Sequence, residues 1–315
     1  MKKKLLIILG ATSLFNSTIA QQQQPIMHPC GTVDAMEEAF KTDPELKKKF
    51  EASQAQFEIE YQKALSNTNA NKITATTYTI PIVFHIMGPQ VVTDQVIINF
   101  VDAVNRDYAR LGSDTGNINP AFKNLYVDAG IRVALAKKDP TGKCTNGIIR
   151  HNSDSPYWTQ NSPNYAYSGT GTNKWPPNQY LNVYIVDCIA STQYTCPVTT
   201  GAYLAGYTYV PGSAPSIAAD AIVYLRSQLG QNSSTQSRVL SHEIGHWLNL
   251  RHTFGNSNNA YFGNTAAPAV NCGATILDDL VGDTPETKGY FSICPSTYSL
   301  DCTSLPNIEN IMDYS

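Results

Sequence analysis

The chain has 315 residues, a formal net charge of -3 at pH 7, 42% hydrophobic residues and 15% charged residues. This composition is that of a globular protein with a real core, and it excludes nucleic acid as a partner because no concentrated basic face is available to bind phosphates. No uninterrupted apolar run approaches the ~18 residues that cross a bilayer, so we expect no membrane span.

The first twenty residues, MKKKLLIILGATSLFNSTIA, contain three lysines, an apolar run from Leu5 to Leu14 and small residues around Ala20. This three-part layout predicts a secretory signal peptide over residues 1–20, cleaved after Ala20. The mature protein is therefore expected to be secreted and extracellular. Seven cysteines fit an oxidising location, and their odd number leaves one thiol for another role or for a partner outside this sequence.

Residues 21–77 are polar and locally helical, with a break at Pro44 and an Asn-rich stretch, SNTNANK, near the end. The pattern predicts a pro-segment followed by a cleavable linker. A disordered or coiled stalk is the alternative, because the segment has little apolar surface to bury.

Hydrophobic patterning changes at Tyr78. TIPIVFHIM indicates a buried strand, and Thr93 caps a helix whose apolar positions recur at helical spacing up to Gly112. The order of strand, helix, further strands and a second long helix predicts one mixed α/β domain over residues 78–315 with a single sheet. The further strands are expected at 131–136, 180–186 and 221–225, with a Tyr-, Asn-, Pro- and Gly-rich loop at 153–179.

The second long helix carries the stretch SHEIGHWLNLRHTFGN, with a predicted capping box at 233–236. His242 and His246 lie four residues apart and therefore project from one face of the helix. His252 would point elsewhere if the helix continued, so the helix must end first. Asn249 is the expected end, because Asn tolerates the left-handed conformation that terminates helices.

Three neutral imidazoles from His242, His246 and His252 would hold zinc and leave one coordination position open, which is typical of a catalytic site. Glu243 lies beside this position and can act as the general base that takes a proton from water activated by the metal. The alternative is that these are ordinary surface histidines on an amphipathic helix. This alternative does not explain why Glu243 lies beside the histidines or why the helix ends before His252. The remaining histidines, His28, His85 and His151, are interpreted as ordinary residues satisfied by hydrogen bonds.

HEIGHWLNLRH and the later NIMDYS resemble the zinc helix and methionine turn of the metzincin metalloproteases, and most closely those of the bacterial pappalysins. TIPIVFHIM, GTGTNKWPPNQYLNVYIV and DDLVGDTPET extend the resemblance from Tyr78 to the end of the chain. It implies an α/β (α+β) metzincin-like fold: a twisted, mostly parallel five-stranded sheet, an active-site helix and a largely irregular C-terminal subdomain. Asn249 departs from the pattern, which commonly has Gly there.

The resemblance also implies roles near the zinc. Met312 would form the hydrophobic floor under the histidines, and Tyr314 would hydrogen-bond the oxyanion of the tetrahedral intermediate. Cys30 resembles the pro-segment thiol that binds zinc in latent forms and blocks hydrolysis. A spare or intermolecular thiol is the alternative for Cys30.

A calcium site in the loop after the zinc helix is a further implication. Asp279, Asp283 and Thr284 offer the oxygen ligands that a hard cation prefers, with Asp278 beside them. A solvated acidic loop without a cation is the alternative.

The cysteines are expected to form two disulfides. Cys188 and Cys196 are close enough in sequence to close a small loop, and the resemblance implies a Cys272–Cys302 bridge. For Cys294 the resemblance implies a partner just after the methionine turn, so we expect the domain to be truncated at its C-terminus. Cys144 has no partner that the sequence suggests.

The sequence therefore predicts a secreted zinc endopeptidase made as a zymogen, with protein or peptide substrates and its own pro-segment as inhibitor. We expect a monomer. A preference for cutting before Arg or Lys is implied by the resemblance, with self-processing before Lys72 as a candidate. The alternative is a catalytically silent, metal-containing binding or adhesion module, against which Glu243 argues because binding needs no base. A third possibility is that the chain, lacking its end, is inactive.

Overall fold

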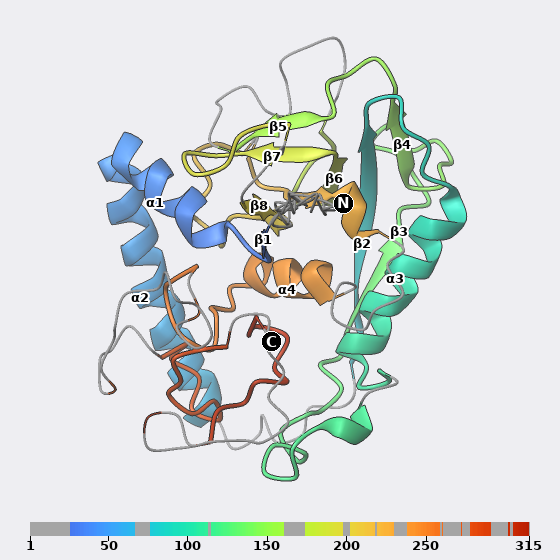
Figure 1. The fold of residues 1–315 in the computed structure, drawn as a ribbon. Helices are drawn as coiled ribbons and strands as arrows, with labels where there is room; N and C mark the ends of the chain where they lie inside the picture. Colours follow the sequence, from blue (N-terminus) through green and yellow to red (C-terminus); the bar gives the residue numbers. More distant parts are fainter. Residues whose placement is uncertain are drawn as a thin grey trace, which may run out of the picture.

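A central sheet flanked by helices forms the body of the protein (Figure 1). The computed structural model describes residues 26–66, 76–112, 115–160, 174–197, 202–217, 219–229, 238–258, 260, 272, 278–290, 302 and 305–314. The predicted signal peptide, the capping box at 233–236, Lys72 and Cys294 lie outside these ranges. Among the helices in these ranges, none has both the length and the hydropathy of a membrane-spanning segment.

The sheet runs in the order β3-β2-β6-β10-β9, with β4 also paired to β2. All pairings are parallel except that of β9 with β10. The strands are β2 Tyr78–Met87, β3 Ile131–Leu135, β4 Ile148–His151, β6 Leu181–Val186, β9 Gly206–Tyr207 and β10 Ile222–Leu225.

Five sheet positions are thus filled by six strands, because β3 and β4 pair with successive parts of the ten-residue β2. This agrees with the predicted mostly parallel five-stranded sheet. The predicted strands at 131–136, 180–186 and 221–225 correspond to β3, β6 and β10. The sequence pattern missed β4 and β9, because strands of two to four residues are too short to show a period.

Two pairs of strands lie outside the main sheet. β1 pairs in parallel with β8, and β5 pairs in parallel with β7. β5 falls inside the stretch 153–179 that was predicted to be a loop, so that prediction is wrong for these residues; three residues carry too little pattern to reveal a strand. The bounds are β1 Ile26–His28, β5 Tyr157–Thr159, β7 Cys188–Ala190 and β8 Ala202–Leu204.

One face of the sheet is covered by α3 (Asp94–Tyr108) and α4 (Arg238–Trp247). α3 begins where predicted, since the Thr93 side chain accepts a hydrogen bond from the Val96 amide. It ends at Tyr108 rather than Gly112, because Arg110 adopts a left-handed φ of 59° that a helix does not accommodate. The core on this face joins both helices to β2, β6 and β10.

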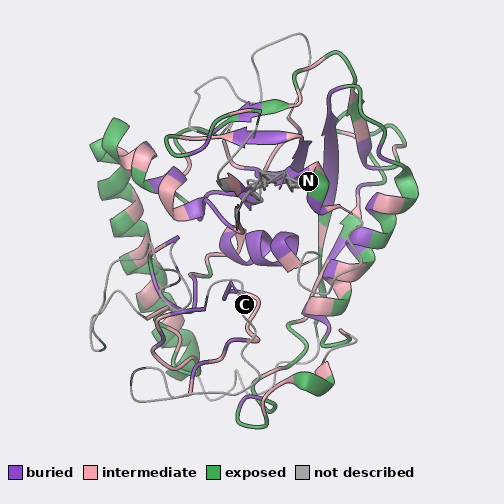
Figure 2. Ribbon diagram, in the orientation of Figure 1, coloured by how far each residue is buried: buried purple, intermediate pink, exposed green. Residues whose placement is uncertain are grey.

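The opposite face is covered by the N-terminal part of the chain. α1 (Thr32–Thr42) buries Ala35, Met36 and Ala39 against residues of β6, β7, β9 and β10. α2 (Pro44–Ser66) follows the predicted break and has no buried side chain. Figure 2 shows the contrast between the buried α4 and the largely exposed α2.

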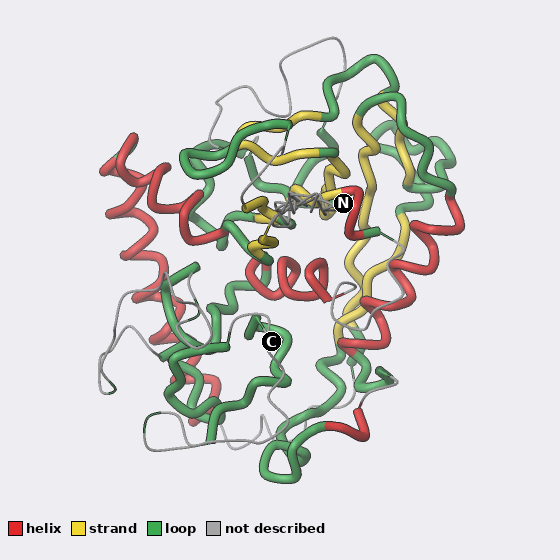
Figure 3. Tube along the Cα trace, in the orientation of Figure 1, coloured by secondary structure: helices red, strands yellow, loops and turns green. Residues whose placement is uncertain are grey.

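The C-terminal part of the described chain has little regular structure. Figure 3 shows loop in the described residues after α4. This agrees with the predicted irregular C-terminal subdomain. Two short 3-10 helices complete the described elements, η2 Thr115–Asn117 and η3 Arg226–Gln228.

Candidate active site

Three candidate site residues come from α4. His242, Glu243 and His246 are all buried, because this amphipathic helix packs Val239, Leu240 and Ile244 into the core next to them. The His242 and His246 ring centroids are 4.6 Å apart, as the four-residue spacing requires.

The chain reverses immediately after the helix. Asn249 adopts the left-handed φ of 76° that the sequence suggested, and the Leu250 amide donates back to the Gly245 carbonyl at 2.9 Å. The reversal brings His252 Nε2 to 3.0 Å from His246 Nε2. The three imidazoles therefore converge.

Cys30 of the N-terminal segment completes this group. The ligand atoms of Cys30, His242, His246 and His252 all lie within 4.8 Å of one another, and all four residues are buried. The Thr32 amide donates to Cys30 Sγ at 3.3 Å, which favours the thiolate. Burial and the nearby Glu243 carboxylate disfavour the thiolate and raise the pKa of Cys30.

The donor set fits zinc. His242 Nδ1 lies 2.6 Å from the Ile311 carbonyl and His246 Nδ1 lies 2.8 Å from the Leu250 carbonyl, so each Nδ1 carries the proton and each Nε2 keeps its lone pair. His242 Nε2 is buried without a hydrogen-bond partner among the described residues. Burial lowers the pKa of all three imidazoles, of His242 to about 4, and neutral imidazoles with a thiolate are typical zinc ligands.

Glu243 is held by the N-terminal segment. Thr32 Oγ1 donates to Glu243 Oε2 at 3.1 Å and accepts from the Thr208 amide at 3.1 Å. Burial raises the pKa of Glu243 to about 8, although the nearby Cys30 thiol and the hydrogen bond from Thr32 oppose the rise. A carboxyl with a pKa near neutrality can both accept and release a proton.

Close backbone approach allows the N-terminal segment to reach this site. The Gly31 amide donates to the Gly206 carbonyl at 3.0 Å, which extends the pairing of β1 with β8. A Cβ on Gly31 would lie 2.5 Å from a methyl of Leu204, so only glycine fits without displacement.

Met312 lies directly under the helix. A Cβ on Gly245 would be 2.3 Å from Met312 Sδ, so the glycine lets the methionine pack against the helix between His242 and His246.

The Tyr314 hydroxyl donates to the Cys30 carbonyl at 3.3 Å, and the Tyr314 ring centroid lies 4.9 Å from that of His252. Burial and nearby acidic groups raise the pKa of Tyr314, so its hydroxyl stays protonated.

A buried carboxylate that the sequence did not single out ties this region together. Asp313 Oδ2 accepts from Thr253 Oγ1 at 2.7 Å, while Oδ1 accepts from the Tyr290 and Tyr314 amides at 3.2 and 2.8 Å. The Thr253 amide also donates to the Met312 carbonyl at 3.3 Å. The residue next to His252 is thereby fixed to the methionine turn.

The predicted calcium residues occupy one turn. Asp279 Oδ1 accepts from the Val281 amide at 2.9 Å, and the Thr284 amide donates to the Val281 carbonyl at 3.0 Å. Burial is the main cause that raises the pKa of Asp279 to about 6, with a further contribution from Asp278 and Asp283. The calcium assignment stays a prediction.

The remaining cysteines and histidines behave largely as expected. The Cys188–Cys196 and Cys272–Cys302 disulfides are formed, and Cys144 is exposed and free. His85 hydrogen-bonds His151 at 3.0 Å and Asn182 at 3.1 Å.

Comparison with known proteins shows that the chain is similar to metalloproteases. The family model of peptidase M43, described as pregnancy-associated plasma protein-A, matches residues 164–315. An extracellular metalloprotease of Colletotrichum graminicola is 25% identical over 281 residues, which cover 82% of this chain and 78% of that protein. One of Podospora anserina is 23% identical over 317 residues, or 98% of this chain and 89% of that protein.

Solved structures give the same result. A mutant of Tannerella forsythia promirolysin matches with a TM-score of 0.67 and 26% identity over 90% of this chain and 86% of that chain. Mature mirolysin of that organism, in complex with a cleaved peptide, matches with a TM-score of 0.61 and 28% identity over 76% and 84% of the two chains.

The sheet, the helix with its converging histidines and the methionine beneath them define a metallopeptidase of the metzincin class. The family match and the solved structures show that the chain is similar to the pappalysin family of metallopeptidases.

Proposed function

We propose that this protein is a secreted zinc endopeptidase made as a latent precursor. The observation that carries the proposal is the convergence of three neutral imidazoles and one pro-segment thiol on a single point beside the Glu243 carboxyl. Secretion is supported by the predicted signal peptide and by the curated relatives, which are named extracellular metalloproteases.

His242, His246 and His252 would hold the metal in both forms, and Cys30 would be the fourth ligand in the precursor. When bound, zinc supplies a Lewis acid that polarises the scissile carbonyl and makes water more acidic. Glu243 takes the proton from the attacking water and delivers it to the departing amine. The Tyr314 hydroxyl, once released from the Cys30 carbonyl, donates a hydrogen bond to the developing oxyanion.

Latency would have two parts. Cys30 fills the coordination position that hydrolysis needs, and Thr32 engages the carboxylate of the base. Both residues belong to the proposed pro-segment, residues 21–77, ahead of a catalytic domain over 78–315. Cleavage in the linker between α2 and β2 would release them together.

Glu243→Gln tests the assignment of the base. Gln has the same shape and can accept the Thr32 hydrogen bond, but it cannot take a proton. We expect the activated variant to cut a denatured protein mixture about 10²–10⁴-fold more slowly than the activated wild type. Wild-type activity in the variant would remove Glu243 from the mechanism.

A zinc chelator tests the metal with the same mixture. Cutting that persists after chelation would overturn the metalloprotease mechanism, and zinc binding without any cutting would favour the binding-module alternative. Sequencing the new N-termini of the cleaved proteins tests the predicted preference for Arg or Lys directly after the cut. Cuts that occur only before apolar residues would count against this preference.

A further inference from the structure

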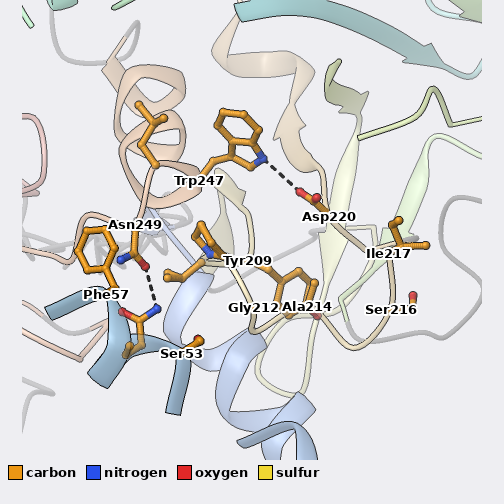
Figure 4. Close-up of a pocket in the computed structure, with 14 residues that line it drawn as sticks. Ser53, Phe57, Tyr209, Gly212, Ala214, Ser216, Ile217, Asp220, Trp247 and Asn249 are labelled. Atoms are coloured by element: carbon orange, nitrogen blue, oxygen red, sulfur yellow. Dashed lines mark hydrogen bonds between the residues drawn. The ribbon is translucent and has the colours of Figure 1, made fainter. Parts of the chain in front are cut away.

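A cavity lies between α2 and the body of the protein, beside the end of α4 (Figure 4). Its volume is about 780 Å³, and α2 contributes Ser53, Gln54 and Phe57 to its lining. The walls from the catalytic domain are mostly apolar: Tyr209, Val210, Ala214, Ile217, Trp247 and Leu248.

The floor of this cavity is fixed in place. The Trp247 indole donates to Asp220 Oδ1 at 3.1 Å, so its polar atom is satisfied and its ring is left as an apolar surface. Trp247 directly follows the ligand His246, which ties the cavity to the catalytic centre.

α2 covers the cavity without filling it. No side chain of α2 is buried, and Phe57 remains 50% exposed at the rim. One hydrogen bond, from Gln54 to Asn249 at 3.0 Å, connects this part of the helix to the end of α4. Cleavage after α2 would therefore expose a preformed apolar surface next to the active site.

Removal of the N-terminal segment after this cleavage would also free the edge of β8 and β9. β1 and Gly31 occupy the edge of β8 and β9 as far as Gly206, which lies against Glu243. An unpaired edge binds an extended peptide through main-chain hydrogen bonds, and antiparallel pairing is the more stable arrangement per residue. A peptide antiparallel to β9 would run from the cavity towards Glu243, with its amino-terminal side over the cavity.

We infer that the apolar surface of this cavity, once α2 has left it, is a substrate subsite for an apolar side chain on the amino-terminal side of the scissile bond. Tyr209 lies three residues beyond Gly206, a span of about 10 Å in an extended chain. The residue recognised is thus the third or fourth before the cut. The inference rests on the proposed peptidase function.

The test uses the processed enzyme obtained from the full-length zinc-loaded precursor and two fluorogenic peptides. Both carry the same residues around the cut, and the longer one adds four residues at its amino end with Phe in the third or fourth position. We expect kcat/KM for the longer peptide to exceed that for the shorter one by about tenfold, mainly through KM, and the gain to vanish when Gly replaces Phe.

Ala214→Trp fills the cavity, and Ile217→Ala opens its exposed wall. Each should bring the ratio of the two kcat/KM values towards one. Val91→Trp, on a loop that does not line the cavity and where Val91 is 87% exposed, is the control and should keep the wild-type ratio. Calorimetry with the amino-terminal product peptide measures the same preference without turnover, with Phe binding more tightly than Gly.

Equal kcat/KM for the Phe and Gly peptides, or a ratio unaffected by Ala214→Trp, would overturn the subsite. If the enzyme cuts neither peptide, the result counts against the proposed peptidase function and not against the subsite. In that case the calorimetric comparison still decides the subsite, and equal binding of the Phe and Gly product peptides would reject it.

Discussion

At the scale of single residues, the proposed metal site depends on the groups that hold the three histidines as much as on the histidines themselves. The Nδ1 atoms of His242 and His246 meet the Ile311 and Leu250 carbonyls, which sets the tautomer that points Nε2 at the common centre. Asp313 then fixes the residue after His252. Buried carboxylates of this kind position other groups through hydrogen bonds.

Asp313→Ala should lower kcat/KM of the activated enzyme about 10–100-fold and weaken zinc binding, because Thr253 and two backbone amides lose their acceptor. Asp313→Asn should recover most of the loss, since its carbonyl can accept from both amides and its NH₂ can donate to Thr253. Zinc competition with a chromogenic chelator and peptide kinetics measure both effects. An Asn variant as impaired as the Ala variant would show that charge, not hydrogen bonding, is required.

At the scale of elements, the end of α4 decides whether His252 can join His242 and His246. A left-handed conformation costs a residue with a Cβ about 1–2 kcal/mol, less for Asn, and glycine avoids the cost. The family pattern commonly has Gly where this chain has Asn249, and the φ of 76° explains why either residue serves.

Asn249→Gly should therefore retain activity, whereas Asn249→Val should lower the free energy of unfolding by about 1–2 kcal/mol and reduce zinc affinity by displacing His252. Chemical denaturation and zinc competition are the measurements. Gln54→Ala is the matched control, because it removes only the hydrogen bond that Asn249 makes with α2. Equal zinc affinity in the Val and Gly variants would contradict the role of the left-handed turn.

Another element-scale feature is His85, a buried histidine of β2 that lies opposite Tyr184 of β6. Asn182 Nδ2 donates to the Trp175 and Tyr180 carbonyls, so its Oδ1 faces His85 Nε2 and accepts that proton. Burial, with a smaller contribution from His151, lowers the pKa of His85 to about 3. Folding therefore favours neutral His85.

The linkage predicts acid sensitivity. Above pH 6.5 neither state protonates His85, but below it the unfolded state binds a proton that the folded state does not, so stability falls by about 1.4 kcal/mol per pH unit until about pH 3. His85→Gln lacks this titration. Denaturation curves from about pH 7 to pH 4.5 should show wild type losing stability faster than His85→Gln, and parallel losses would contradict the assignment.

At the scale of the whole molecule, the N-terminal segment completes both the fold and the site. β1 extends the strand edge beside the candidate active site, α1 adds buried residues to one core, Cys30 reaches the three histidines and Thr32 reaches Glu243. α2 adds coverage with no buried side chain. The first part of the segment, up to the end of α1, is therefore anchored at the site, whereas α2 is held only lightly.

Cys30→Ser should give a precursor that is active or degrades itself, because the thiolate ligand is lost. The Thr32 contact with Glu243 remains in this variant, so Cys30→Ser combined with Thr32→Val should be more active than the single change. Peptide hydrolysis by the uncleaved precursors and gel analysis of their decay are the measurements. A Cys30→Ser precursor as silent as wild type would exclude the thiol from latency.

The sequence by itself determined what depends on short spacing: the pair of histidines on one helical face, the helix end at Asn249, the break at Pro44 and the long strands. It left open which distant groups would meet them. Only the family resemblance suggested that Cys30 would reach the histidines, and nothing in the sequence suggested that Thr32 would reach Glu243 or that Asp313 would join Thr253 to Tyr290; all of these contacts link residues far apart in the chain. Only the packed sheet and helices decide such contacts, because no local period or propensity encodes them.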